Sequence, residues 1–158
     1  MRRASLGALI LALVAVSFSP EVAQAQRIRT GVLNCDVSAG LGLIIGSQRS
    51  VNCLFTPDVP GPQEGYFGTI TKFGLDLGAT AGGSMVWAVY ADTSRGYGFL
   101  AGDYAGASGE ATVAVGLGAN VLVGGSNRTV ALQPLSLTGQ VGLNVALGVA
   151  NLSIRPSR

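Results

Sequence analysis

The sequence predicts an all-β protein: a single small, glycine-rich barrel or sandwich of about eight or nine mostly antiparallel strands, preceded by a cleavable signal helix. Three observations support this prediction. Apolar residues alternate with period two along most of the chain, which is the spacing of a strand and not of a helix. Clusters of turn-forming residues separate the alternating stretches. The 24 glycines among 158 residues lack the every-third-residue spacing of collagen.

The N-terminus is typical of an export signal. Arg2 and Arg3 precede the uncharged stretch LGALILALVAVSF (residues 6–18), which is too short to cross a hydrocarbon core of roughly 30 Å as a helix. Pro20 ends the apolar stretch, and Ala23-Gln24-Ala25 supplies the small residues that a signal peptidase requires.

We therefore expect cleavage after Ala25, so that residues 1–25 are a signal peptide and residues 26–158 form a single all-β domain. No later segment is long and apolar enough for a membrane-spanning helix. The protein is expected in the periplasm or outside the cell.

The two cysteines, Cys35 and Cys53, fit an oxidising compartment. They lie in two short apolar stretches, and neighbouring antiparallel strands would bring them to bonding distance. A structural disulfide closing a loop of about 19 residues would contribute roughly 3 kcal/mol. The alternatives are two buried thiols or a redox pair, although redox pairs are usually closer in sequence, as in C-x-x-C.

In the first two thirds of the chain, turn residues separate short apolar stretches. Pro57 to Gly65 contains three prolines and two glycines, which predicts an exposed loop because proline cannot donate a ladder hydrogen bond. The strands expected in this part are Gly31–Ser38, Leu41–Ile45, Ser50–Thr56, Tyr66–Leu77, Met85–Ala91 and Gly98–Ala105.

The clearest alternation lies in the last third. In Thr112–Val123 and again in Gly139–Val149, the bulkier apolar residues occupy odd-numbered positions, and Gly, Ala, Asn or Thr occupy most even-numbered ones. Each stretch predicts a half-buried strand with one face almost free of side chains. After Ala150 the apolar phase moves to Leu152 and Ile154, which predicts a β-bulge.

Two irregularities are expected between these strands. Gly124 to Asn127 is a cluster suited to turn residues with positive φ. Pro134, within the expected strand Val130–Thr138, implies an edge position or a bulge.

Glycine inside a strand weakens it, so the glycine density requires a reason. One reason is tight curvature of a small barrel; another is close approach by a second sheet or an apolar ligand. The period-two alternation could instead indicate an outer-membrane barrel, but such a barrel needs aromatic girdles at both interfaces. No aromatic residue follows Tyr104, which disfavours it.

Composition excludes several function classes. The chain has no histidine, ten Lys+Arg against eight Asp+Glu, and a single lysine, Lys72. This excludes Ser-His-Asp and Cys-His catalysis, His-ligated metal sites and a strongly basic nucleic-acid surface. We therefore expect a protein that is not an enzyme and has no cofactor, metal or nucleic-acid partner.

Motifs for chemistry are weak. Asp103 and Glu110 flank an expected turn, so a hairpin would bring them together, either as an acid–base pair or as a solvated hairpin end. Gly40-Leu41-Gly42 lacks the following Gly-Lys of a phosphate loop, and Gly116-Leu117-Gly118 lies inside an expected strand. Trp87 is interpreted as a core residue, with an aromatic ligand platform as the alternative.

Four arginines lie close to the two ends of the mature chain. If the ends meet, these charges would face anionic lipid headgroups or surface glycans; otherwise they belong to solvated tails. The residues are Arg27, Arg29, Arg155 and Arg158.

Several stretches resemble the bacterial family catalogued as domain of unknown function 992. They are CDVSAGLGLIIGS, KFGLDLG, MVWAVYA, LAGDYAGASGEATVAVGLGANVLVGGSNR and ALQPLSLTGQVGLNVALGVANL. The resemblance covers essentially the whole mature chain and implies a small exported protein of Gram-negative bacteria. It implies no activity and no catalytic residues.

A looser similarity is to SYLF-type lipid-binding domains. Its counterparts here are the Gly/Ala-rich segment Gly109–Val123, the turn Gly125–Arg128 and the segment Leu135–Gly139. The basic residues that those domains use are mostly missing here. We expect a periplasmic structural or interaction module of the cell envelope, or alternatively a lipid or small apolar ligand binding protein, with envelope lipids or other envelope proteins as partners.

Overall fold

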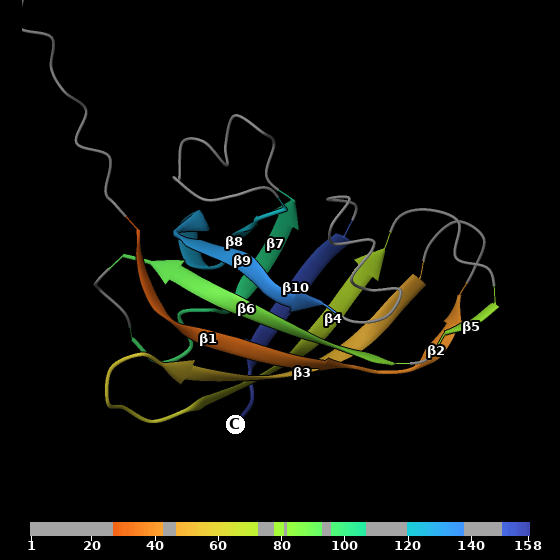
Figure 1. Cartoon of the computed structure of the whole chain (residues 1–158), viewed down its shortest axis with the longest axis horizontal. Helices are drawn as coiled ribbons and strands as arrows, with labels where there is room; N and C mark the ends of the chain where they lie inside the picture. Colours follow the sequence, from red (N-terminus) through yellow and green to blue (C-terminus); the bar gives the residue numbers. More distant parts are fainter. Residues whose placement is uncertain are drawn as a thin grey trace, which may run out of the picture.

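The computed structural model describes residues 27–42, 47–72, 78–80, 82–92, 96–106, 120–137 and 150–158, so the expected signal peptide lies outside the described residues. Eight antiparallel strands close into a barrel (Figure 1). The all-β prediction is therefore confirmed, and the fold is a barrel. The barrel strands are β1 (Ile28–Val37), β3 (Ser47–Pro57), β4 (Glu64–Lys72), β6 (Gly83–Ala91), β7 (Gly102–Gly106), β8 (Leu122–Gly124), β9 (Val130–Leu137) and β10 (Ala150–Pro156).

Three short elements complete the described structure. The strands β2 (Gly40–Gly42) and β5 (Gly78–Thr80) pair with each other outside the barrel (Figure 1). The 3-10 turn η1 (Ser126–Arg128) joins β8 to β9. Within the described parts of the chain, no helix is long and apolar enough to cross a membrane.

The barrel combines two three-stranded meanders. Around the barrel the strand order is β1-β3-β4-β10-β7-β8-β9-β6. Each meander is followed in the chain by one more strand: β6 closes the barrel between β1 and β9, and β10 lies between β4 and β7. As a result, strands from opposite halves of the chain become neighbours.

The predicted alternation places large side chains inside the barrel. On β1, Leu33, Cys35 and Val37 are buried, whereas the intervening Asn34 and Asp36 are exposed. Every strand of the barrel contributes large, fully buried side chains, which include Trp87, Tyr66, Tyr104, Phe55, Leu33, Ile70, Leu122, Leu132 and Leu152. Trp87 is therefore a core residue, as the sequence predicts.

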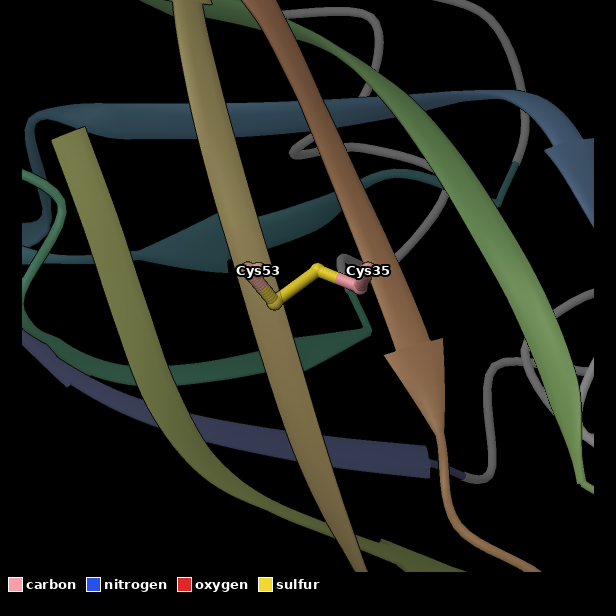
Figure 2. The surroundings of a disulfide bond; sticks show 2 residues. All are labelled: Cys35 and Cys53. Atoms are coloured by element: carbon pink, nitrogen blue, oxygen red, sulfur yellow. A yellow bond between two sulfur atoms is a disulfide. The ribbon is translucent and has the colours of Figure 1, made fainter. Parts of the chain in front are cut away.

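The disulfide predicted from the sequence joins β1 to β3. Cys35 and Cys53 are directly opposite in the ladder, with their Cα atoms 4.0 Å apart. Figure 2 shows the two sulfurs bridging the adjacent strands. Both cysteines face the interior, at 1 % and 6 % exposed, so the bridge belongs to the core.

Close approach between strands explains two of the strand glycines. A Cβ atom at Gly68 on β4 would overlap the carbonyl oxygen of Ser153 on β10. At Gly124 on β8 it would overlap the carbonyl oxygen of Asp103 on β7. These two glycines therefore permit close approach between neighbouring strands of the same barrel, a reason different from the curvature and the second-sheet or ligand contacts that the sequence suggested.

Pro134 marks a bulge, one of the two alternatives predicted for it. Val86 on β6 pairs with Ser136, and the next residue, Trp87, pairs with Pro134, so Leu135 has no direct partner on β6. The missing N–H of Pro134 therefore falls at an irregular point of the ladder.

Two sequence expectations need correction. The strand predicted at Gly98–Ala105 begins only at Gly102, because Tyr97–Leu100 forms a turn in which Gly98 has φ of 77°. In β8 the inward residue is Leu122, opposite Leu132, and not Val123. The positive φ of Asn120 (67°) breaks the alternation just before β8.

Other predicted features fall partly outside the described residues. Leu152 and Ile154 are fully buried, as the shifted phase predicts. The bulge proposed to cause that shift, the strand Gly139–Val149 and most of Thr112–Val123 lie in the undescribed parts of the chain.

Candidate functional site

The main candidate site is a groove on the outside of the barrel, over β4, β10 and β7. Its floor consists of outward-facing side chains that the ladder aligns in rows. In one row Thr71 pairs with Asn151, and Asn151 pairs with Ala105. In the next row Thr69 pairs with Ser153, and Ser153 with Asp103. Directly opposite residues have Cβ atoms roughly 5 Å apart, so the polar groups form a regular array.

The groove has a volume of about 1060 Å³ and is partly open to solvent. Eight of its seventeen described lining residues carry hydroxyl or amide groups, and five of the others are glycine or alanine. The described lining includes Gln48, Thr69, Thr71, Asp103, Ala105, Gly106, Val123, Ser126, Asn127, Arg128, Asn151 and Ser153.

Strand periodicity explains why these groups share one surface. On β10 the inward residues Leu152 and Ile154 are fully buried, whereas Asn151 is exposed and Ser153 half-buried. On β7 the inward Tyr104 is buried between the exposed Asp103 and Ala105. The buried side chains anchor each strand, and this anchoring fixes the position of the polar residues on the opposite face.

The turn that follows β8 forms a wall of the groove. Three residues in it have positive φ: Gly125 (φ 73°), Asn127 (φ 53°) and Arg128 (φ 56°). Positive φ is thus confirmed for Gly125 and Asn127 of the predicted cluster Gly124 to Asn127 and also occurs at Arg128, whereas Gly124 belongs to β8. Non-glycine residues adopt this region at a cost of about 1 kcal/mol or more each, so contacts elsewhere must hold the turn in place.

Hydrogen bonds from Arg27 brace this turn. Its Nε donates to the carbonyl of Thr129 at 3.0 Å, and its Nη2 donates to the carbonyl of Arg128 at 2.8 Å. The Thr129 hydroxyl also donates to the Ser126 carbonyl at 2.8 Å. Arg27 is therefore a positioning residue for the groove wall.

The charged side chains described around the groove are one carboxylate and one guanidinium. Asp103 lies on the floor and Arg128 in the wall, and both are exposed. Tyr104 also borders the groove, but its hydroxyl donates to the buried carbonyl of Leu100 at 2.7 Å. Burial raises the pKa of Tyr104 far above its usual range, which keeps this hydroxyl protonated.

A second, smaller hollow of about 420 Å³ shares the turn residues Ser126 and Asn127 with the groove. It is lined by Asp92, the Tyr97–Phe99 turn, Ser126, Asn127 and Thr129, among others. Beside it, Glu64 accepts hydrogen bonds from the Tyr66 hydroxyl and from the Gly98 amide. Burial and the contact with Glu64 raise the pKa of Tyr66 far above its usual range.

The outer face of β3 and β4 carries exposed apolar residues. Leu54 is 43 % and Phe67 51 % exposed. Phe67 is directly opposite Asn52 on β3 and Arg155 on β10, so Leu54 is its diagonal neighbour. This patch lies next to the groove, but its chemistry is different.

The predicted site residues are thus distributed over several places. Asp103 lies in the groove, and Glu110 lies outside the described residues. Residues Gly40-Leu41-Gly42 form the short strand β2. Where the structure describes the chain, no three His, Cys, Asp or Glu residues gather as metal ligands.

The four terminal arginines have different environments. Arg27 braces the turn, and Arg29 makes an ion pair with Asp58 at 3.2 Å. Arg155 and Arg158 are exposed. Two of the four charges assigned to lipid headgroups are therefore engaged within the protein.

Sequence reasoning missed most of the groove. Thr69, Thr71, Asn151 and Ser153 occupy the polar phase of their strands, so alternation marks them as outward-facing. Sequence reasoning also missed Arg49 on β3. This residue is 3 % exposed and shares the phase of the inward residues Val51, Cys53 and Phe55.

Comparison with protein families identifies the family of this chain. The family described as DUF992, protein of unknown function, matches residues 14–155. The chain belongs to this family. The resemblance drawn from the sequence motifs is confirmed, whereas the similarity to SYLF-type domains is not shown. The searches of curated proteins and of solved structures returned no match.

Proposed function

We propose that this DUF992 protein is a non-enzymatic binding module of the cell envelope that holds its ligand in the groove over β4, β10 and β7. The observation that carries the proposal is the aligned array of hydroxyl and amide side chains around a hollow of about 1060 Å³. A cleft of this size is large enough for a small-molecule or oligomeric ligand.

The composition of the groove supports binding over catalysis. Acid–base or nucleophilic catalysis needs a poised base or an activated nucleophile. The chain has no histidine, and the buried Tyr104 hydroxyl stays protonated. The remaining described lining groups are neutral, apart from Asp103 and Arg128.

The barrel interior offers less support for an apolar ligand. Trp87, Leu33 and Ile70 are fully buried there and pack in one apolar cluster. Eight-stranded barrels are just wide enough for side chains to fill or to hold one small ligand, and these large side chains favour a filled interior. The open groove is therefore the better candidate.

Export to the envelope rests on the N-terminal sequence and on the disulfide. Arg2-Arg3, the apolar residues 6–18 and Ala23-Gln24-Ala25 have the order of a signal peptide. The buried Cys35–Cys53 bridge suits an oxidising compartment such as the periplasm.

A blocking variant tests the groove even while the identity of its ligand is open. The melting temperature of the purified protein is measured in buffer and in the small-molecule fraction of a periplasmic extract from its own host. A ligand present at ten times its Kd adds roughly 1.4 kcal/mol of stability, which raises Tm by about 4 °C for a domain of this size.

The variant Ala105→Trp places a large side chain in the groove from an exposed position on β7. The control Asn34→Trp adds the same side chain at an exposed position on β1 that is not part of the described groove lining. We expect wild type and Asn34→Trp to show the shift and Ala105→Trp to lose it. An equal shift in all three proteins, or none in any, contradicts the proposal.

A further inference from the structure

We infer that the ligand of the groove is a neutral oligosaccharide, an inference that rests on the proposed function. The first reason is the kind of hydrogen-bonding group present. Thr69, Thr71 and Ser153 carry hydroxyls, and Asn151 and Gln48 carry amides. Each of these side chains both donates and accepts, and a sugar hydroxyl also does both.

The second reason is the charge of the groove. One carboxylate, Asp103, and one guanidinium, Arg128, balance each other among the described lining residues. An anionic ligand is normally held by several arginines or lysines, so the described lining matches a ligand without net charge. The Asp103 carboxylate accepts hydrogen bonds only, which suits the hydroxyl groups of a sugar and repels an anion.

The third reason concerns the shape and polarity of the floor. Transferring an apolar ligand onto Thr71, Asn151 and Ser153 would remove water from polar groups without replacing their hydrogen bonds, which is unfavourable. Ala105 and the half-buried Val123 continue the row of Thr71 and Asn151 across β7 and β8, and with Gly106 they form an apolar strip next to the polar groups. A sugar ring presents hydroxyls at its edge and C–H groups on its face, so it can contact both parts.

The fourth reason is the rigid support of the polar groups. The floor residues lie on paired strands, and Arg27 fixes the wall through hydrogen bonds to Thr129 and Arg128. Preorganised side chains lose little freedom on binding, and many neutral hydrogen bonds can then add up to useful affinity.

The test uses the purified mature protein with its disulfide intact. It is applied to a printed array of neutral, N-acetylated and anionic oligosaccharides, and N-acetylchitotetraose, maltotetraose and tetragalacturonate are titrated in solution by calorimetry. We expect binding to at least one neutral oligosaccharide. Thr71→Ala and Asn151→Ala should each weaken that binding about fivefold, the effect of one neutral hydrogen bond. The control Asn34→Ala changes an exposed asparagine on β1 and should leave affinity unchanged.

Asp103→Asn separates neutral from anionic ligands. It keeps the side-chain shape and should weaken a neutral sugar; tighter binding, or a preference for anionic oligosaccharides, overturns the inference. Absence of binding to every oligosaccharide, while the extract still gives a Tm shift that Ala105→Trp removes, overturns the inference and leaves the proposed function standing. Polar peptides would then be the next ligand class. Absence of the Tm shift in the wild-type protein contradicts the proposed function.

Discussion

At the scale of single residues, two residues in the wall of the groove adopt an unfavourable backbone conformation. Asn127 and Arg128 both have positive φ without being glycine. Strain of this kind persists where the surrounding structure enforces it, and it is often found at functional sites. Here the hydrogen bonds from Arg27 to the carbonyls of Thr129 and Arg128 enforce it. The strained turn in turn positions the Arg128 side chain on the groove.

Arg128→Gly should therefore stabilise the protein. Glycine adopts positive φ without steric cost, so we expect the free energy of unfolding to rise by about 0.5 to 1 kcal/mol in urea titrations. Arg128→Ala is the matched control, because it removes the same guanidinium and keeps the strain. A glycine variant no more stable than the alanine variant would show that the turn is unstrained.

The two buried tyrosines make stability dependent on alkaline pH. Burial raises the pKa of Tyr66 and Tyr104 in the folded protein. The folded state thus holds these protons more tightly than the unfolded chain, in which tyrosine ionises near pH 10. The stabilising contribution is complete below about pH 10 and is lost as the pH rises towards the folded-state pKa values.

We expect Tm to fall as the pH rises above about 10, and the tyrosinate absorbance of these two residues to develop only together with unfolding. Tyr66→Phe combined with Tyr104→Phe should flatten this pH dependence. If all tyrosinate absorbance developed while the circular-dichroism spectrum stayed native, neither side chain would be as protected as its burial indicates.

At the scale of elements, pairing between distant strands could not be predicted from the sequence. Alternation identified most strands and their buried phase, for example Leu33, Cys35 and Val37 on β1. It failed at β8, where the left-handed Asn120 resets the phase before Leu122. Alternation also does not predict which strands pair. Thr71 lies opposite Asn151 only because β10 pairs with β4. The groove was therefore not predictable as a site.

The disulfide between β1 and β3 should make a large contribution to the free energy of unfolding. Cys35 and Cys53 are 18 residues apart, so the bridge restricts a loop that is free in the reduced, unfolded chain. Reduction should lower the free energy of unfolding by roughly 3 kcal/mol. The double variant Cys35→Ala with Cys53→Ala should melt at the same temperature with and without reductant. Two alkylatable thiols in freshly purified, unreduced protein would refute the bridge.

At the scale of the whole molecule, the strand order repeats itself. In each half of the chain, a three-stranded meander is followed by one strand that pairs with one end of its own meander and one end of the other: β6 joins β1 to β9, and β10 joins β7 to β4. The groove lies at the second of these junctions, so its floor takes Thr69 and Thr71 from one half and Asn151, Ser153 and Asp103 from the other. Closure of the whole barrel thus assembles the site.

A map of amide chemical shifts tests most sharply whether the groove holds the ligand. The small-molecule fraction of the host periplasm is added to the ¹⁵N-labelled mature protein, and the amides that move are assigned. We expect changes along β4, β10, β7 and the turn around Arg128, including Thr71, Asn151 and Ala105, with Asn34 on β1 unchanged. Changes confined to the Leu54 and Phe67 face, or spread over the interior residues around Trp87, would show that the ligand binds elsewhere.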